Sequence, residues 1–284
     1  MERLLVTGAT GFLGVRCVSW FSDKYELIPC SHADLDICDR RAVVDFFRCY
    51  RPSRVIHTAA VSDTGYAEAH PEKSRLVNVD GTVNIAMACQ EVGAKLIFMS
   101  SDQVYSGVPG TKKNVEDQIL VPQPVYGKHK LMAEECVRDV LPSAVGLRLT
   151  WMYDSLSSPY RLNRNILFQL DAACRNECPL KVPIYDIRGI TNVWEVVSRL
   201  ESCWALPGGI YNFGCENSLN AFDTFCAVAN LLGWSSLEGS IIPDHVRFAD
   251  APRNLLLDLE KLRSFGLDFP DTIEGLRIFL SDKK

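Results

Sequence analysis

A tyrosine and a lysine four residues apart, Tyr126 and Lys130, are the side chains best placed to do chemistry in this chain. They lie in the run YGKHK at the start of a segment with helical pattern, and residues four apart share one face of a helix. Ser101 ends the apolar run KLIFMSS, which has the pattern of a buried strand. When a hydride reaches a carbonyl, negative charge develops on oxygen, so an acid and a hydrogen-bond donor must lie close by. We predict Tyr126 as the acid and Ser101 as the donor to the substrate oxygen.

Lys130 has two predicted roles. A free phenol has a pKa of about 10, and a neighbouring ammonium favours the phenolate. We therefore expect Lys130 to lower the pKa of Tyr126 and to hold the nicotinamide ribose. Each of the three residues has a structural alternative: a half-buried helix start, a solvated charge and a strand-end cap. The order of glycine turn, strand-end serine and YxxxK at the start of the next helix favours the catalytic interpretation.

The first apolar run, RLLVTGA over residues 3–9, leads into the glycine-rich sequence TGATGFLG. Gly8 would permit a tight turn, Gly11 would let the backbone approach phosphate oxygens, and Gly14 would let the helix pack closely on the sheet. The first turn of that helix adds N–H groups and the positive end of its dipole. We predict that this turn holds the pyrophosphate of a dinucleotide, and the residues predicted to bind the cofactor here are Gly8, Thr10, Gly11, Phe12, Leu13 and Gly14.

The end of the second apolar run, ELIPCS, bears on which nicotinamide cofactor is used. In NAD-selective sites an acidic residue at the end of the second strand accepts hydrogen bonds from the ribose hydroxyls. Cys30, Ser31 and His32 stand there instead. A 2′-phosphate is then not repelled, and Arg16, Ser31 or His32 could contact it. The sequence therefore favours NADP(H) over NAD(H), with Ser31 as a cofactor contact.

Regular elements must bring these residues together. Apolar or β-branched runs alternate with segments that carry apolar residues at three- and four-residue spacing, which indicates strands alternating with crossover helices. Right-handed crossovers then give an α/β fold, a doubly wound parallel sheet of the Rossmann type. The five predicted strands lie at 3–9, 26–31, 54–60, 95–101 and 145–150.

The pattern changes after Thr150, where a smaller, partly discontinuous domain is expected. We predict a dinucleotide-binding domain at 1–153, with a return strand and helix near 184–214, and a mainly substrate-binding domain at 154–284. Gly233 is expected to end a helix. Further strands are predicted near 180–182 and 209–213, and helices at 165–175, 194–203 and 221–232.

Composition excludes several classes of protein. The chain has 284 residues, 47% of them hydrophobic, and a net charge of −5 with Lys and Arg dispersed, so no nucleic-acid partner is expected. Its eleven cysteines are odd in number and predicted to be reduced; Cys174 and Cys178 lack a second ligand pair, so no metal site is expected. With no signal-peptide pattern and no run of eighteen apolar residues, we expect a soluble cytoplasmic protein without a membrane partner.

The motifs resemble those of the extended short-chain dehydrogenase/reductase family. The similar segments are TGATGFLG, HTAA (57–60), NVDGT (78–82), SSDQVYSG (100–107) and YGKHK (126–130). Within that family the chain is most similar to the dTDP-4-dehydrorhamnose reductases, through DLDICD (34–39), LRLTWMY (147–153) and APRN (251–254).

The resemblance implies further site residues. Asn78 would support the central helix, and Asp102 and Trp151 would touch the sugar of the substrate. A core aromatic at the domain junction is the alternative role for Trp151. Additional cofactor contacts are implied at Asp36, Ile37, Ala59 and Ala60.

The resemblance also implies a function, an NAD(P)H-dependent reductase of a 4-keto-6-deoxy sugar nucleotide, commonly homodimeric. The family's Gln-x-Gly-x-Pro-Thr segment is Ile187–Asn192 here, without its Gln and Pro, and its Arg-Pro is Arg253-Asn254. These departures leave the exact sugar nucleotide open. The alternatives are a sugar-nucleotide epimerase or dehydratase of the same family, and a non-catalytic NADP-binding module like the regulatory subunit of methionine adenosyltransferase.

Overall fold

The computed structural model describes residues 1–176, 178–234 and 239–281, in which the chain forms two compact units. The first unit comprises Met1–Val104, Pro122–Arg148 and Val197–Tyr211. The second comprises Tyr105–Val121, Leu149–Val196 and Asn212–Lys284. These bounds differ from the predicted division at residue 153, because the chain passes between the units several times.

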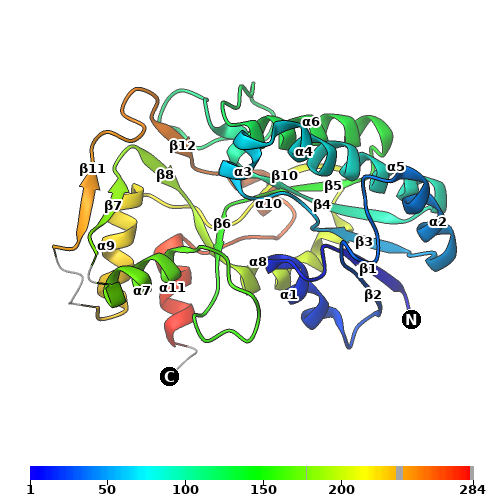
Figure 1. The fold of residues 1–284 in the computed structure, drawn as a ribbon, viewed down its shortest axis with the longest axis horizontal. Coiled ribbons are helices and arrows are strands. Elements are labelled where there is room, and N and C mark those ends of the chain that lie inside the picture. Colours follow the sequence, from blue (N-terminus) through cyan, green and yellow to red (C-terminus); the bar gives the residue numbers. More distant parts are fainter. Residues whose placement is uncertain (177, 235–238, 282–284) are drawn as a thin grey trace. The chain divides into compact units, whose positions relative to one another are not determined.

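A six-stranded sheet lies at the centre of the Rossmann-type α/β fold, in the order β10-β5-β4-β3-β1-β2 (Figure 1). The strand pairs β2–β1, β1–β3 and β3–β4 are all parallel. The predicted doubly wound parallel fold is therefore confirmed. Its strands are β1 (Arg3–Thr7), β2 (Glu26–Cys30), β3 (Arg54–His57), β4 (Lys95–Ser101), β5 (Val145–Leu149) and β10 (Gly209–Phe213).

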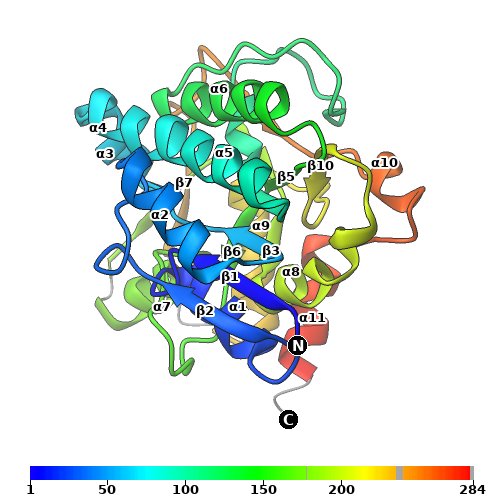
Figure 2. The same cartoon turned by 90° about the vertical axis from the view of Figure 1, so that its right-hand side faces the viewer.

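Helices cover both faces of this sheet, with α2, α5 and α6 on one face and α1 on the other (Figure 2). Asp39 begins α2 by accepting hydrogen bonds from the backbone N–H groups of Arg41 and Ala42. Gly93, at φ +74°, ends α5 in the left-handed conformation. The helices are α1 (Phe12–Phe21), α2 (Arg40–Tyr50), α3 (Thr64–Ala69), α4 (Pro71–Arg75), the π-helix η1 (Leu76–Gly81), α5 (Thr82–Val92), the 3₁₀ helix η2 (Asp102–Tyr105), α6 (Val125–Val140) and the 3₁₀ helix η3 (Ser202–Ala205).

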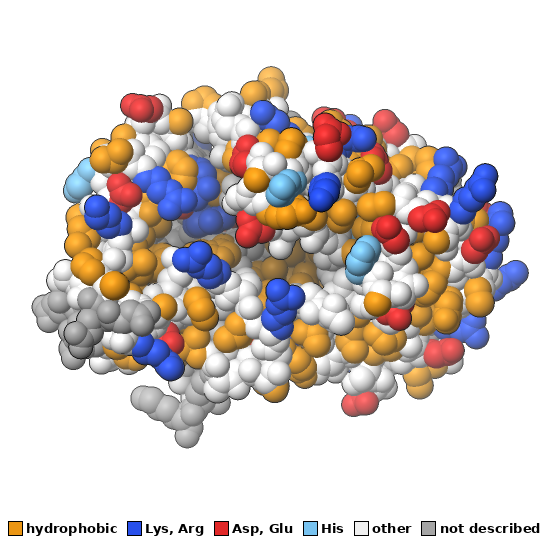
Figure 3. Space-filling model, in the orientation of Figure 1, with side chains coloured by type: hydrophobic (Ala, Val, Ile, Leu, Met, Phe, Trp, Pro, Cys, Tyr) orange, Lys and Arg blue, Asp and Glu red, His pale blue; other side chains and the backbone are white. Residues whose placement is uncertain are grey.

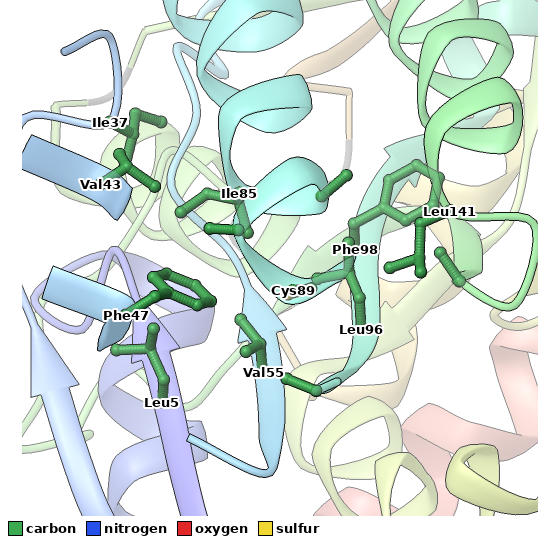
Figure 4. Packing of buried hydrophobic residues seen from close by; sticks show 14 of the residues in the cluster. Leu5, Ile37, Val43, Phe47, Val55, Ile85, Cys89, Leu96, Phe98 and Leu141 are labelled. Atoms are coloured by element: carbon green, nitrogen blue, oxygen red, sulfur yellow. The ribbon is translucent and has the colours of Figure 1, made fainter. Parts of the chain in front are cut away.

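The core under α2, α5 and α6 is made by side chains that are buried in the strands and on the inner helix faces (Figure 4). Phe47 of α2 and Ile85 of α5 belong to the same buried cluster as Leu5 and Val55 of the sheet. Burying each such side chain contributes about 1.5–3 kcal/mol. This core holds the strand ends and the helices at set positions relative to one another.

The second unit contains three pairs of short parallel strands in its described residues, β6–β9, β7–β11 and β8–β12. Most of these strands were not predicted, because three- or four-residue strands carry almost no periodic signal. Its elements are β6 (Trp151–Tyr153), α7 (Ile166–Asn176), β7 (Leu180–Pro183), β8 (Asp186–Arg188), β9 (Ile190–Asn192), α9 (Ala221–Leu231), β11 (Ile241–Asp244), β12 (Arg253–Leu255), α10 (Glu260–Arg263) and α11 (Thr272–Ser281). The helix α8 (Val193–Leu200) begins in the second unit and ends in the first.

The segment Tyr105–Val121, predicted to belong with the nucleotide-binding half, lies in the second unit. Asn114 explains this placement, because its backbone N–H donates to Leu256 O at 2.8 Å and its amide donates to Asn254 O at 3.1 Å. The side chain of Asn254 in turn donates to Lys112 O at 2.6 Å. These bonds join residues about 140 positions apart, which local sequence pattern does not reveal.

Basic and acidic side chains are interspersed on the molecular face drawn in Figure 3. Such mixing offers no continuous positive track on that face for a nucleic-acid backbone. Over the residues that the structure describes, no helix is both long enough and apolar enough to cross a bilayer.

Candidate active site

The three predicted catalytic residues lie in the first unit, at the end of β4 and the start of α6. Ser101 is the last residue of β4, and Tyr126 and Lys130 lie one turn apart in α6. All three are nearly buried, with 8%, 8% and 4% of their surfaces exposed. Parallel strands place ligands at their carboxyl ends, so this position suits a site.

The start of α6 is held by contacts that the sequence analysis did not anticipate. Glu68 accepts a hydrogen bond from the backbone N–H of Val125 at 2.8 Å, which caps the first turn. Gly127 lets η2 come close, since a Cβ there would lie 2.4 Å from Gln103 O. Gly127, directly after the tyrosine, was the feature of the sequence that could have predicted this close approach. The approach keeps Tyr126 beside the end of β4.

Ser101 lies in a small buried network of hydrogen bonds. Its Oγ donates to Asp102 Oδ1 at 3.1 Å and accepts from the backbone N–H of Gln103 at 3.2 Å. The side-chain amide of Gln103 donates to the same carboxylate oxygen at 3.4 Å, while Gln103 Oε1 is buried with no hydrogen-bond partner in the described residues. The network fixes the serine hydroxyl. The substrate contact predicted for Asp102 stays a prediction.

Lys130 is anchored to β4. Its Nζ donates to Met99 O at 2.8 Å and lies 5.7 Å from the ring centroid of Tyr126. Burial lowers the pKa of Lys130 to about 8, and the negative charge of Glu134 partly opposes that effect. Lys130 is therefore a cation at neutral pH, and it loses its proton as the pH rises above about 8.

The pKa of Tyr126 is raised overall, so the lowering predicted from Lys130 is not the net result in this structure. Burial is the largest cause and the charge of Asp102 adds to it, while a hydrogen bond with Ser101 acts in the opposite direction. The ammonium of Lys130 is directed to a backbone carbonyl of β4 instead of the phenol oxygen. Tyr126 therefore stays protonated across the physiological range, as a proton donor requires.

The glycine turn presses closely on neighbouring backbone. Gly8 has φ +67°, and a Cβ on it would lie 2.7 Å from Ala59 N. A Cβ on Gly14 would lie 2.1 Å from Gly8 O, and Gly11 N donates to that same oxygen at 2.8 Å. Side chains would block the turn at Gly8 and Gly14, so the backbone itself forms a cradle before α1. This arrangement fits a pyrophosphate at the helix N-terminus.

The remaining predicted residues of the turn differ in exposure. Thr10 is exposed, Phe12 is half-buried and Leu13 is buried. Arg16 is fully buried, bonded to Phe12 O, with its guanidinium 4.1 Å from the Phe12 ring centroid. The guanidinium is therefore directed toward its own helix, and Arg16 does not present itself to a 2′-phosphate. Ala59, which follows β3 and is half-buried, touches the glycine turn, and its contact with the cofactor stays a prediction.

The carboxylate of Asp34 lies close to the end of β2, although the last residue of that strand is Cys30. Asp34 Oδ2 accepts from Ser31 N at 2.8 Å and from Ser31 Oγ at 2.6 Å, which lowers the pKa of Asp34. Cys30 O accepts from Ala9 N at 3.1 Å, so this turn adjoins the glycine-rich loop. The position of Asp34 could not be predicted from the sequence, because a tight turn folds its carboxylate back by three residues. His32 is exposed beside it.

The residues implied along the adenine lie on opposite sides of their loop. Asp36 is exposed and accepts from Cys38 N at 3.0 Å. Ile37 is buried in the core (Figure 4), where a Cβ on Gly81 would lie 2.7 Å from its side chain. Ala60 is half-buried after β3. The cofactor contacts of Asp36, Ile37 and Ala60 stay predictions.

Two buried polar residues connect the site to the helices behind it. Asn78, in η1, accepts from Val61 N at 2.8 Å and donates to Val61 O at 2.9 Å, so it holds the chain after Ala60. His57, at the end of β3, bonds to Thr7 Oγ1 at 2.7 Å and Thr82 Oγ1 at 3.1 Å. Burial and the charge of Lys130 lower the pKa of His57 to about 3. The imidazole is therefore neutral.

Trp151 lies in the second unit. Its ring stacks on Phe225 at 6.4 Å, and the guanidinium of Arg188 lies 5.6 Å from its centroid. Trp151 is half-buried against a hydrophobic cluster of that unit, so part of its ring belongs to the core. Its contact with substrate stays a prediction.

Metal-ligand chemistry has no support in the described residues, where no group of three or more His, Cys, Asp and Glu could hold an ion. All eleven cysteines are free thiols, Cys174 and Cys178 included.

Comparisons with known proteins extend over nearly the whole chain. The model of the RmlD substrate binding domain family matches residues 1–283. The spore coat polysaccharide biosynthesis protein SpsK of Bacillus subtilis is 33% identical over 100% of this chain and 98% of its own length. Methionine adenosyltransferase 2 subunit beta of Xenopus laevis is 28% identical over 94% of this chain and 83% of its own.

Solved structures agree on the fold. A dTDP-4-dehydrorhamnose reductase from Bacillus anthracis, solved in complex with NADP, superposes with a TM-score of 0.87 at 24% identity, covering 100% of both chains.

Proposed function

The chain belongs to the RmlD substrate binding domain family, and we propose on that basis that it is an NAD(P)H-dependent reductase of a 4-keto-6-deoxy sugar nucleotide. The observation that carries this proposal is the buried, protonated Tyr126 beside Ser101 at the carboxyl end of β4. A phenol kept neutral is suited to giving a proton to a carbonyl oxygen that becomes an alkoxide. Membership of the extended short-chain dehydrogenase/reductase class agrees with this chemistry.

The first unit has the groups that the reaction needs. The backbone cradle of Gly8, Gly11 and Gly14 would hold the pyrophosphate of a nicotinamide dinucleotide, and Lys130 would hold its ribose. When bound, that cofactor supplies the hydride. Ser101 Oγ would turn its hydrogen from Asp102 to the substrate carbonyl oxygen, and Tyr126 Oη would give that oxygen a proton. The cationic Lys130 then stabilises the phenolate that Tyr126 becomes.

We propose NADPH as the preferred reductant, because the residue that ends β2 carries no carboxylate. A structural neighbour was solved with NADP, which agrees with that preference. Asp34 acts against it, since its carboxylate folds back onto Ser31. The preference is therefore expected to be moderate, with NADH also used.

The substrate class follows from the family and its relatives. One structural neighbour is named as a dTDP-4-dehydrorhamnose reductase, and one relative as a polysaccharide biosynthesis protein. We propose a dTDP-linked 4-keto-6-deoxy sugar, with Asp102 and Trp151 as sugar contacts. Homodimerisation is proposed from the family's habit, and a cytoplasmic location from the free thiols, which suit a reducing compartment.

The test is the loss of reduced-nicotinamide absorbance when the purified protein meets a dTDP-4-keto-6-deoxy sugar, with NADPH and NADH compared. Tyr126→Phe is the control, and it should lose about 10²–10⁴-fold in kcat while its cofactor affinity is unchanged. Absence of turnover in the wild-type protein despite tight nucleotide binding would contradict the proposal.

A regulatory role is the second candidate, because several relatives are named as the beta subunit of methionine adenosyltransferase 2. Such a module would bind a nicotinamide nucleotide and a catalytic subunit without turning over sugar. Tyr126→Phe separates the two functions, since a binding module would keep its partner affinity and have no turnover to lose. An epimerase is distinguished by a nicotinamide cofactor that survives purification.

A further inference from the structure

Glu134 lies on the same face of α6 as the catalytic pair, two turns beyond Tyr126 and one beyond Lys130. Only 3% of its surface is exposed, although an ionised carboxylate is costly to bury without partners. The mechanism proposed above gives it no role. Glu134 is thus a buried acid on the same helix face as the proton donor Tyr126 and the cation Lys130, and its burial needs a physical reason.

Both carboxylate oxygens of Glu134 are engaged by side chains from two strands. Arg148, on β5, donates from Nε to Oε1 at 2.9 Å and from Nη2 to Oε2 at 2.7 Å, and it is 3% exposed. Ser100, on β4, donates from Oγ to Oε1. The two-point guanidinium contact fixes the plane of the carboxylate as well as its position.

These bonds meet the catalytic residues at adjacent positions of the chain. Ser100 directly precedes Ser101, and Met99 before it accepts the hydrogen bond of Lys130. Two consecutive residues of β4 are therefore bonded to α6, one through Lys130 and one through Glu134. Together the bonds set how far the helix carrying Tyr126 can slide along the strand carrying Ser101.

We propose that Glu134, held by Arg148, is the positioning residue that sets the distance between Ser101 and Tyr126 in the active site. This inference rests on the proposed reductase function. It concerns alignment, because Glu134 touches neither of those two side chains in the described contacts. Small misplacements matter here, since a shift of about 1 Å between reacting groups can cost about 100-fold in rate.

Stability alone is a weak reason to keep such a pair. Replacing both partners of a buried ion pair by apolar residues of similar volume often leaves stability unchanged or raises it, whereas removing one partner leaves a buried charge unpaired. A double replacement therefore separates folding from alignment. Glu134→Leu combined with Arg148→Met should fold and should still misalign the site.

Glu134 also acts on the charge of Lys130. The ionisable groups with a described interaction with Lys130 are Glu134 and Tyr126 on α6 and His57 on β3. Among them Glu134 raises the pKa of Lys130 against the effect of burial. In Glu134→Gln the ammonium should be lost at lower pH, so the alkaline limb of the rate should move down in pH. A residue that only supports the fold would not move that limb.

The experiment measures kcat, KM, cofactor affinity and the pH profile of the wild-type protein and its variants with NADPH and a dTDP-4-keto-6-deoxy sugar. We expect kcat to fall about 10- to 100-fold in Glu134→Gln and in the double variant, with cofactor affinity within about twofold of wild type. The double variant should melt near the wild-type temperature.

Val137→Ala is the matched control, since it shortens another side chain of α6 that is fully buried in the core. It should lower the melting temperature without changing kcat or the pH profile. Native kcat in a folded double variant, or equal kcat losses in the control, would overturn the positioning role. Wild-type protein without turnover would instead overturn the proposed function, so the two failures are distinct.

Discussion

In the first unit a strand and a helix hold the candidate site. In the second unit, hydrogen bonds from side chains to backbone join segments that are distant in the chain. In the first unit, Ser101, Tyr126 and Lys130 take their positions from one strand end and one helix face. In the second, buried asparagines bridge distant segments: Asn212 donates to Asn114 O at 2.8 Å and Asp258 O at 2.9 Å. Regular elements suit chemistry that must be precise, and irregular ones allow a substrate surface to vary.

The contrast between the two units predicts that replacing a helical glycine by alanine weakens nucleotide binding in the first unit only. Gly14→Ala should weaken nucleotide binding by about 100-fold or more, because its Cβ would lie 2.1 Å from Gly8 O and displace the cradle. Gly275→Ala is the matched change in α11, where the closest atom would be Pro270 Cγ at 3.3 Å. Titration of NADPH fluorescence measures both, and equal losses would argue against a cradle at Gly14.

The stability of the second unit offers the next test. Asn212→Ala removes two donated hydrogen bonds and the acceptor of Tyr105 Oη at 2.6 Å, so unfolding should become easier by about 2–3 kcal/mol. Cofactor affinity should be unchanged. The exposed Asn230→Ala should stay within about 0.5 kcal/mol of wild type. Urea unfolding measures the loss, and a parallel fall in NADPH affinity would show that the units are not independent in this respect.

The rate of the proposed reaction should depend on pH through the charge of Lys130 in the first unit. Below a pH of about 8 Lys130 carries a proton and can balance the phenolate of Tyr126, and above it that charge is lost. The rate should therefore fall about tenfold per pH unit on the alkaline side. Steady-state kcat from pH 6 to 10 measures this. A level profile across that range would mean that the charge of Lys130 is not needed.

The smallest expected effect concerns cofactor choice. Asp34→Ala removes the carboxylate that Ser31 holds at the end of β2, so the preference for NADPH over NADH should rise about fivefold. The ratio of the two kcat/KM values is the readout, and Asp23→Ala, at an exposed position after α1, is its control. An unchanged ratio would place the 2′-phosphate away from Asp34.

Much of the first unit could be predicted because local pattern determines it. The five predicted strands all form, within three residues of their expected ends, since buried parallel strands are continuous apolar runs. The second unit was harder to predict, because its short strands are paired with partners far along the chain. The segment Tyr105–Val121 groups with the second unit for the same reason, although the predicted division at residue 153 placed it with the nucleotide-binding half.

The sequence by itself determined the fold class, the glycine turn and the Ser101, Tyr126 and Lys130 constellation, since each depends on residue type at short spacing. Only the tertiary structure decided which charges act on them. Burial and Asp102 raise the pKa of Tyr126, and Arg148 reaches Glu134 from another strand. Electrostatic effects depend on distance in space and on exclusion of water, and neither can be read from positions along the chain.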